Sequence, residues 1–256
     1  MISGTVAVPI YNSVGIAWLV MESLCRQNKP INGWELIVFE EQHPTQIGEE
    51  WVRAYEERLA EVGCERVLYL TSETKVPLSI KWGDMARASA ETSEYFCMCG
   101  CDDYFHPYHL IEAEGAVKEA DWALTPKGYF YDFHLDKVFM YNHNAFIGLH
   151  MVGKTDMMRN LPREVVNVGV DTWTNTQLRM MAKKENRKLK IMLKTSDHWE
   201  NILCTNGLNN ISTSRISFFK DIRYPFFTTT AKLEDIVPED ISNKLKELSQ
   251  CLKSQS

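Results

Sequence analysis

Short apolar runs alternate with amphipathic segments over the first hundred residues. The apolar runs are typical of buried strands, and they are Thr5–Ile10, Trp34–Phe39, Glu65–Leu70 and Tyr95–Cys101. Between them, apolar side chains recur at helical spacing from residue 12 to 28, from 51 to 63 and over Ile80–Ala90. Asn12 or Ser13 is a suitable N-cap for the first helix, and Gly63 a C-cap for the second. This alternation predicts an α/β fold with a parallel sheet and right-handed crossovers.

The second half of the chain has a different pattern. Tyr129–Phe133 and Lys137–Tyr141 flank a short polar segment, which predicts an antiparallel hairpin with an aromatic strand. The remaining elements that we expect are strands at Ala145–His150 and Leu189–Leu193, a helix at Asp171–Glu185 and a terminal helix from Pro238.

Composition narrows the class of protein. The chain has 256 residues, of which 45% are hydrophobic and 24% charged, so it can build a full core. A net charge of −6 argues against a dedicated nucleic-acid binder but leaves a nucleic-acid substrate open. No apolar run approaches ~18 residues, and the N-terminus has the pattern of a first strand instead of a signal peptide. The seven cysteines, an odd number, are expected as free thiols in a reducing cytoplasm.

The most informative stretch is Glu94–Pro107, where an apolar strand runs into the adjacent carboxylates of Asp102 and Asp103. In open α/β sheets, ligands bind in the crevice at the carboxyl ends of the strands. Carboxylate oxygens at that position suit Mg²⁺ or Mn²⁺ bound to a diphosphate. This arrangement points to nucleotide-sugar chemistry.

Five motifs, in chain order, resemble those of the family-two glycosyltransferases with a GT-A fold. They are the strand and turn Val6–Asn12, the helix end Ser23–Gln27, the strand Trp34–Val38, the stretch Glu94–Tyr104 and the tripeptide Gly169–Asp171. The family has at these places a Pro-x-Tyr-Asn-like turn, a Ser-Leu-x-x-Gln helix end, its second strand, the strand before a metal-binding Asp-x-Asp, and a Gly-Glu-Asp before a helix. The resemblance covers roughly residues 5–200.

The resemblance implies a GT-A, Rossmann-like mixed sheet with flanking helices in a single domain. Within it we expect a nucleotide-sugar half (1–103), an acceptor and catalytic half (104–200) and a C-terminal extension (201–256). The sequence also departs from the family. Gly100 replaces the first carboxylate of Asp-x-Asp, the second strand ends in Glu40-Glu41 instead of Asp-Asp, and Asp84-Met85 lies near the place of an Arg-Asn pair.

The resemblance implies a metal site at Asp102, where a divalent cation bridges to the donor diphosphate and offsets the charge of the leaving group. The alternative is that Asp102 and Asp103 cap the following helix. We expect Asp103 to cap or support the site instead of binding the metal. His198 lies where GT-A enzymes often place a histidine that completes the metal site, although a lone histidine is more often a surface or core residue.

Asp171 is the candidate general base, which takes the proton of the acceptor hydroxyl in an inverting transfer. The alternative is a helix N-cap, since Asp before a helical run is a favoured cap. Trp173 offers a flat ring to a sugar or nucleobase, and a buried helix position explains it nearly as well. The residues expected to line the nucleotide are Pro9, Tyr11, Asn12, Glu40, Asp84 and Cys101.

These nucleotide-site assignments also have structural alternatives. Tyr11 could pack in the core, Glu40 could lie in a solvated loop, and Asp84 could pair with an arginine. Cys97, Cys99 and Cys101 alternate along a strand, and packing under a helix explains them better than a zinc site does.

The segment Lys183–Lys190 contains five cations. These cations either complement the dipole of a helix C-terminus or contact the phosphates of a DNA, RNA or lipid-phosphate acceptor. The sequence alone leaves both interpretations open.

We therefore expect a metal-dependent glycosyltransferase, using Mn²⁺ or Mg²⁺, a nucleotide-sugar donor (a UDP-sugar by default) and an acceptor hydroxyl. The acceptor is open: a glycan, a lipid carrier, a protein or a modified DNA base. A nucleotidyltransferase would have a Gly-rich, basic loop in place of Tyr11-Asn12-Ser13. A catalytically inert sugar- or nucleotide-binding scaffold is the other alternative. Gly100 favours it, and Asp102 and Asp171 argue against it.

Overall fold

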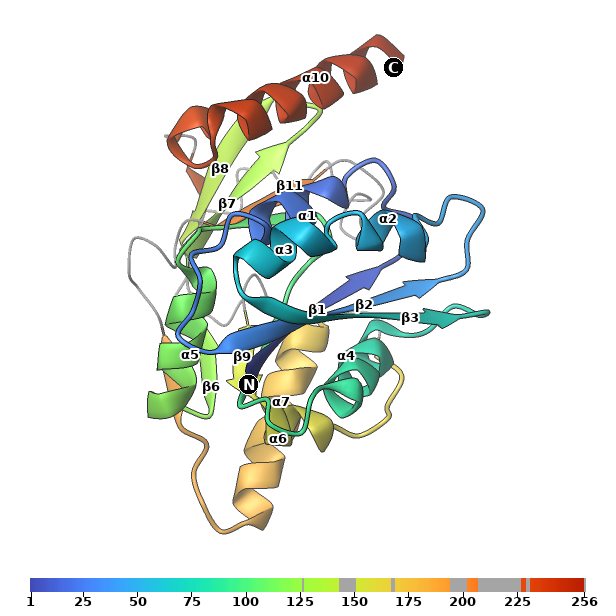
Figure 1. Cartoon of the computed structure of the whole chain (residues 1–256). Coiled ribbons are helices and arrows are strands. Elements are labelled where there is room, and N and C mark those ends of the chain that lie inside the picture. Colours follow the sequence, from blue (N-terminus) through green and yellow to red (C-terminus); the bar gives the residue numbers. More distant parts are fainter. Residues whose placement is uncertain are drawn as a thin grey trace.

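The computed structural model describes residues 1–125, 127–142, 151–166, 169–193, 202–206, 227–228 and 231–255. Its described strands form two sheets (Figure 1). The main sheet has seven strands in the order β10-β6-β9-β4-β1-β2-β3. These strands are β1 Ile2–Ile10, β2 Gly33–Glu41, β3 Cys64–Ser72, β4 Tyr95–Met98, β6 Trp122–Leu124, β9 Met151–Lys154 and β10 Ile191–Leu193.

The main sheet is mixed. Strands β1, β2, β3 and β4 run parallel, so their carboxyl ends lie at one edge. Strand β9 runs antiparallel to both of its neighbours, β4 and β6, and β10 pairs in parallel with β6. The predicted α/β fold is confirmed, and the strands of this sheet are parallel except for β9.

Two layers of helices cover the main sheet (Figure 1). One hydrophobic cluster packs the sheet against α1 Trp18–Leu24, α2 Glu49–Arg53, α3 Glu56–Glu61 and α5 His109–Glu119. The opposite cluster packs it against α4 Leu78–Ala88, α6 Thr155–Arg159 and α7 Val170–Lys184. Cys97 and Cys99 are fully buried in the first cluster with Cys101 packed against it, which confirms their interpretation as core residues.

The second sheet has the strand order β12-β8-β7-β11-β5. Its strands are β5 Asp103–Phe105, β7 Lys127–Asp132, β8 Lys137–Asn142, β11 Ile202–Asn206 and β12 Phe227–Thr228. The C-terminal helix α10, Glu239–Gln255, follows the short helix Leu233–Asp235 and shares a core with Trp18, Tyr131 and Phe133. Strands β7 and β8 form the predicted antiparallel hairpin.

Three predicted elements differ in the structure, and one lies outside the described residues. The first helix begins at Trp18 with Ala17 at its N-cap position, so the expected cap at Asn12 or Ser13 is wrong. The helix expected from 51 to 63 is divided, because the N–H of Tyr55 bonds to the carbonyl of Val52, three residues back, at 3.1 Å. The strand expected at Tyr95–Cys101 ends at Met98, where the chain turns toward the second sheet. The expected strand Ala145–His150 falls on residues that are not described.

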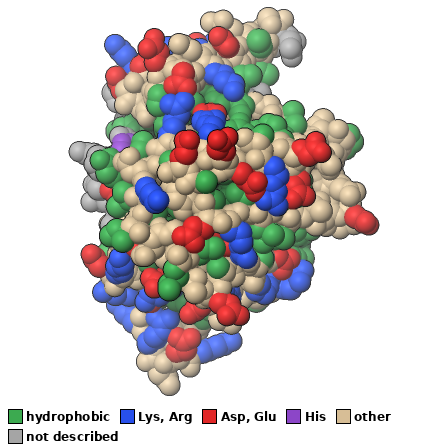
Figure 2. Space-filling view, in the orientation of Figure 1, with side chains coloured by type: hydrophobic (Ala, Val, Ile, Leu, Met, Phe, Trp, Pro, Cys, Tyr) green, Lys and Arg blue, Asp and Glu red, His purple; other side chains and the backbone are tan. Residues whose placement is uncertain are grey.

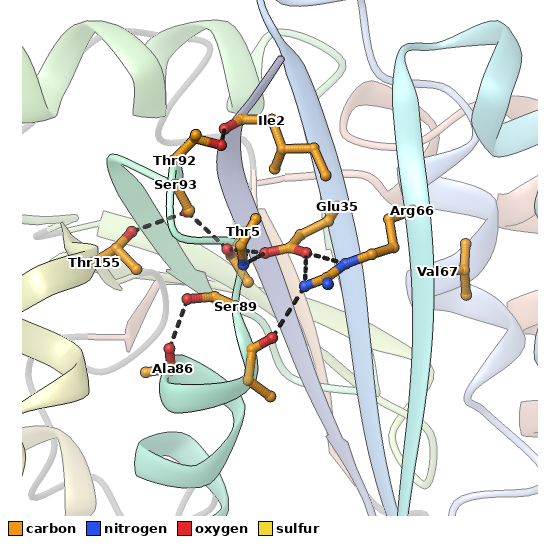
Figure 3. A network of polar contacts seen from close by, with 12 residues as sticks. Ile2, Thr5, Glu35, Arg66, Val67, Ala86, Ser89, Thr92, Ser93 and Thr155 are labelled. Carbon is orange, nitrogen blue, oxygen red and sulfur yellow. Dashed lines mark hydrogen bonds and ion pairs between the residues drawn. The ribbon is translucent and has the colours of Figure 1, made fainter.

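A buried polar network lies at the amino edge of the main sheet (Figure 3). The Glu35 carboxylate is fully buried and accepts hydrogen bonds from Thr5 Oγ1 (2.7 Å), the Ala90 N–H (2.7 Å) and Arg66 Nε (2.6 Å). Ser93 Oγ continues the network from Thr5 at 2.8 Å. These bonds fix the loop before β4 to β1, β2 and β3.

Candidate functional site

The carboxyl edge of the main sheet brings together the turns that follow β1, β2, β3 and β4. Four of the side chains on these turns form one contact group. Asn12 Oδ1 accepts a hydrogen bond from Thr45 Oγ1 at 2.7 Å, and the Tyr11 and His43 rings meet edge to face at 5.4 Å. His43 Nδ1 lies 2.7 Å from Thr45 Oγ1. The turns after β1 and β2 are therefore joined through polar and aromatic side chains.

Tyr11 is an exposed member of this group. The residue is 37% exposed, which excludes the core-packing alternative. Lys75 Nζ, from the loop after β3, lies 4.7 Å from the centre of the ring, so a cation sits beside the aromatic surface. Asn12 has a φ of 49°, a left-handed conformation that asparagine tolerates better than most residues.

Glu40 lies below this surface group. It is 1% exposed, so the solvated-loop alternative is wrong. Its carboxylate accepts hydrogen bonds from the N–H groups of Ile47 (2.9 Å) and Gly48 (3.0 Å) and from the Tyr69 hydroxyl (2.7 Å). Both of its oxygens thus hold the loop that presents His43 and Thr45.

Glu41 and Lys81 form a buried ion pair next to Glu40. Glu41 also accepts the Val76 N–H at 3.0 Å, and Lys81 Nζ donates to the Ile10 carbonyl at 3.0 Å. Burial lowers the pKa of Lys81 from its usual range, and the hydrogen bond to Glu41 partly opposes this shift. This pair ties together the end of β1, the end of β2 and the loop after β3.

Asp102 lies in the turn where the chain leaves the main sheet. Its side chain is half-buried, and its carbonyl accepts a hydrogen bond from Thr205 Oγ1 of β11 at 3.1 Å. The neighbouring Cys101 thiol donates to Ser13 Oγ at 3.2 Å, which links this turn to the turn after β1. Burial, followed by the charge of Asp102, raises the pKa of Cys101 to about 12, so it is a neutral thiol.

Asp103 begins β5 and is 8% exposed. The expectation that it caps the next helix is wrong, because α5 begins at His109 and has no side-chain cap. Burial, and then the charge of Asp102, raises its pKa well above the usual range, against hydrogen bonds to Cys204 and to the Gly100 backbone. A Cβ on Gly100 would lie 2.4 Å from Asp103 Oδ2, so this carboxylate fills the space beside residue 100.

Asp171 is the second residue of α7. The helix follows Gly169, which has a φ of 67° and occupies the N-cap position. The N-cap alternative for Asp171 is therefore wrong, and the half-buried carboxylate lies in the first turn, where the helix dipole favours a negative charge. Trp173 is half-buried, and its Nε1 donates to Glu164 at 2.9 Å.

The remaining predicted residues are spread over the fold. Pro9 is half-buried within β1, opposite Phe39. Asp84 lies on α4 and accepts from Arg87 at 2.7 Å and from Arg163 at 3.3 Å, so the alternative of an arginine partner is the one observed. His198 lies outside the described residues.

The side chains at this edge were tested for a divalent cation. Within the described part of the chain, no group of three or more His, Cys, Asp or Glu residues is placed to share a metal ion. Asp102 nevertheless fits as a single protein ligand, because Mg²⁺ is commonly held by one or two carboxylates, phosphate oxygens and water. Its half-buried side chain follows β4 at the carboxyl edge of the sheet, which is compatible with that role.

Several residues of this edge, among them His43, Lys75 and Lys81, were not predicted from the sequence. His43 and Lys75 lie in loops without a repeating pattern, and their only signal is their position just after β2 and β3. Lys81 lies in a helix and is 3% exposed. A lysine at an inward-facing position of an amphipathic helix is the signal that could have identified it.

Known proteins were compared with the sequence and the structure. No protein-family model and no curated protein matches the sequence. Among solved structures, S. aureus TarS 1–349 in complex with UDP-GlcNAc matches with a TM-score of 0.59 and 15% identity, over 80% of this chain and 58% of that one. The mannosyltransferase PcManGT from Pyrobaculum calidifontis, in complex with GDP-Man and Mn²⁺, matches with a TM-score of 0.55 and 15% identity, over 95% and 69%.

These similarities establish the fold. The protein shares the mixed α/β, GT-A fold of these structures, as the sequence motifs predicted. The chain spans about 60% of the TarS 1–349 structure it matches. No helix in the described ranges is long and apolar enough to cross a membrane.

Proposed function

We propose that the protein is a metal-dependent, inverting glycosyltransferase that moves a sugar from a nucleoside diphosphate to an acceptor hydroxyl. The observation on which the proposal depends is that Asp102 follows β4 at the same edge of the sheet where the turns after β1, β2 and β3 bring together Tyr11, His43 and Lys75. The GT-A neighbours crystallised with UDP-GlcNAc and with GDP-Man support a nucleotide-sugar donor.

The donor nucleotide is proposed to occupy the surface around Tyr11. The Tyr11 and His43 rings offer flat faces to a nucleobase, and Lys75 offers a positive charge to the ribose-phosphate side. Glu40 and the Glu41–Lys81 pair act as positioning residues, because their polar atoms are engaged by the loops that they hold. A UDP-sugar is the default donor.

Asp102 is proposed to hold the divalent cation. When bound, the cation supplies positive charge that offsets the charge developing on the departing diphosphate. Asp171 is proposed as the general base that accepts the proton of the acceptor hydroxyl while its oxygen attacks the anomeric carbon. It lies in the first turn of α7, where the helix dipole favours a negative charge.

The test is release of nucleoside diphosphate from a panel of UDP- and GDP-sugars, with Mn²⁺, Mg²⁺ or EDTA. We expect metal-dependent release from one donor, reduced at least about 10²-fold in Asp102→Asn, because a transition-state charge contact is lost. Asp235→Asn, at an exposed carboxylate on the short helix before α10, is the matched control and should retain activity.

Thermal melts of both variants show whether they are folded. The outcome that contradicts the proposal is the absence of release from every donor together with no donor binding by calorimetry. That result would favour an inert scaffold on the GT-A fold.

A further inference from the structure

A basic hollow lies at the C-terminal end of α7. It has a volume of about 420 Å³ and is lined by Arg179, Lys183, Asn186, Arg187, Lys188 and Leu189. Four of the six side chains are cationic and none is acidic. In the space-filling view, Lys and Arg side chains lie among Asp and Glu side chains at the lower end of the molecule, where α7 ends (Figures 1 and 2).

The chain reversal after α7 builds this hollow. Asn186 adopts a left-handed conformation with a φ of 55°, and the Arg187 N–H returns to the Ala182 carbonyl at 3.0 Å. This turn brings Arg187 and Lys188 back beside the last helical turns, which present Lys183. A helix dipole needs cations only within the last turn, so it does not explain those that lie beyond the helix.

The cations of the hollow are of two kinds. The Arg187 side chain is held in place, because its guanidinium donates hydrogen bonds to Asp121 Oδ2 at 2.6 Å and to Glu185 Oε2 at 2.7 Å. Neither Lys183 nor Lys188 forms an ion pair with any described residue, and both are exposed. The hollow therefore combines a pre-arranged guanidinium with two ammonium groups whose charge is available to a ligand.

An exposed face of α7 leads from this hollow to Thr172, in the same first turn of the helix as Asp171. Thr172, Thr176, Arg179 and Lys183 are all exposed and follow one another at intervals of four, three and four residues, which places them on one side of the helix. No carboxylate occurs between Asp171 and Glu185. At 1.5 Å per residue, Lys183 lies about 18 Å along the helix from Asp171.

We propose that the acceptor is a phosphodiester polymer, whose backbone occupies the basic hollow while a hydroxyl further along the same chain reaches Asp171. This inference rests on the proposed function and names its acceptor class. A small acceptor cannot span about 18 Å, whereas a polymer with repeating phosphates can contact Lys183 and Lys188 and still extend along α7. Because the net charge of the protein is −6, this attraction is local and falls with added salt.

Binding is measured by fluorescence anisotropy over a salt series, without donor. The probes are labelled single-stranded DNA of about 20 nucleotides, a duplex of the same length, and an abasic strand that has the same phosphodiesters but no bases. We expect the abasic strand to bind about as tightly as the DNA strand. In Lys183→Gln/Lys188→Gln, binding should weaken about tenfold. The slope of log K against log salt concentration should become less negative by about 1.4, which is about 0.7 for each phosphate contact removed.

The matched control is Lys29→Gln/Lys232→Gln, which removes the same charge from exposed positions outside the hollow and should bind as the wild type does. The inference is overturned if no probe binds, if the two double variants lose affinity equally, or if the abasic strand fails to bind while DNA does. Nucleotide release by the wild type is scored separately. Release without polymer binding defeats only this inference, and polymer binding without release or donor binding defeats only the proposed glycosyl transfer.

Discussion

At the amino edge of the main sheet, Glu35 is enclosed by donors from β1, β3 and the loop before β4, whereas at the carboxyl edge Glu40 and Glu41 hold loops whose own side chains stay exposed. All three carboxylates are essentially inaccessible. At the amino edge, the hydrogen bonds of Glu35 join only strands β1 and β3 and the loop before β4 (Figure 3). At the carboxyl edge, Glu40 and Glu41 hold the loops that contain His43 and Lys75, and both of these residues contact the Tyr11 ring.

This difference shows that a buried carboxylate at a strand end is not by itself a ligand site. Burial without partners would cost several kcal/mol, so each of these groups has been paired within the chain. The residues proposed to contact the donor are instead those on the loops that the paired groups hold in place, such as His43 and Lys75. Variants that break each edge in turn should separate stability from donor binding.

Lys81→Met should have the largest effect, because it leaves the Glu41 carboxylate buried without its cation. We expect a loss of about 3–5 kcal/mol in the free energy of unfolding and a rise of about tenfold in the KM for the donor, as the turn after β1 loses its anchor. Urea denaturation and nucleotide-release kinetics measure the two effects.

The double variant Glu41→Leu/Lys81→Met is the control for this prediction. Replacing a buried ion pair by apolar side chains is often neutral, so it should recover most of the stability. The raised KM should remain, because the hydrogen bond to the Ile10 carbonyl is still missing. If the KM returned to the wild-type value together with stability, the positioning role of Lys81 would be wrong.

Glu35→Ala tests the amino edge. It removes the acceptor of three donors, and we expect unfolding to require about 3 kcal/mol less. The kinetics per folded molecule should not change, since no side chain of this network extends to the carboxyl edge. Glu65→Ala, an exposed acid on β3, should change stability by less than about 0.5 kcal/mol. A change in donor KM without loss of stability would remove the distinction between the two edges.

The same comparison explains how much the sequence could predict. Strands β1 to β3, the β7–β8 hairpin and α7 follow from local periodicity and flanking turn residues, and the structure confirms them; β4 is also present but ends three residues earlier than predicted. The Asp102 turn could be located because a carboxylate after a buried strand is a local signal. The division between α2 and α3 could not, because it depends on a single backbone bond at Tyr55.

The roles of Glu40 and Glu41 were also not predictable from local pattern. Their partners include Tyr69, Val76 and Lys81, which are 29 to 40 residues away in sequence. A buried acid and a solvated acid look alike in one sequence, and only the arrangement of β2, β3 and α4 distinguishes them. The filling of the space beside Gly100 by Asp103 is a further contact that needs the three-dimensional structure.

Tyr11→Ala should have the smallest effect and is the sharpest test of the carboxyl edge. The exposed ring has no core to support, so the free energy of unfolding should change by less than about 0.5 kcal/mol. Loss of an aromatic face for the nucleobase should raise the donor KM about three- to tenfold, with kcat little changed, because the ring binds the ground and transition states alike. Tyr108→Ala, at an exposed tyrosine before α5, is the matched control and should leave KM unchanged. If kcat fell while KM stayed constant, Tyr11 would act at the reacting centre and the nucleobase assignment for this surface would be wrong.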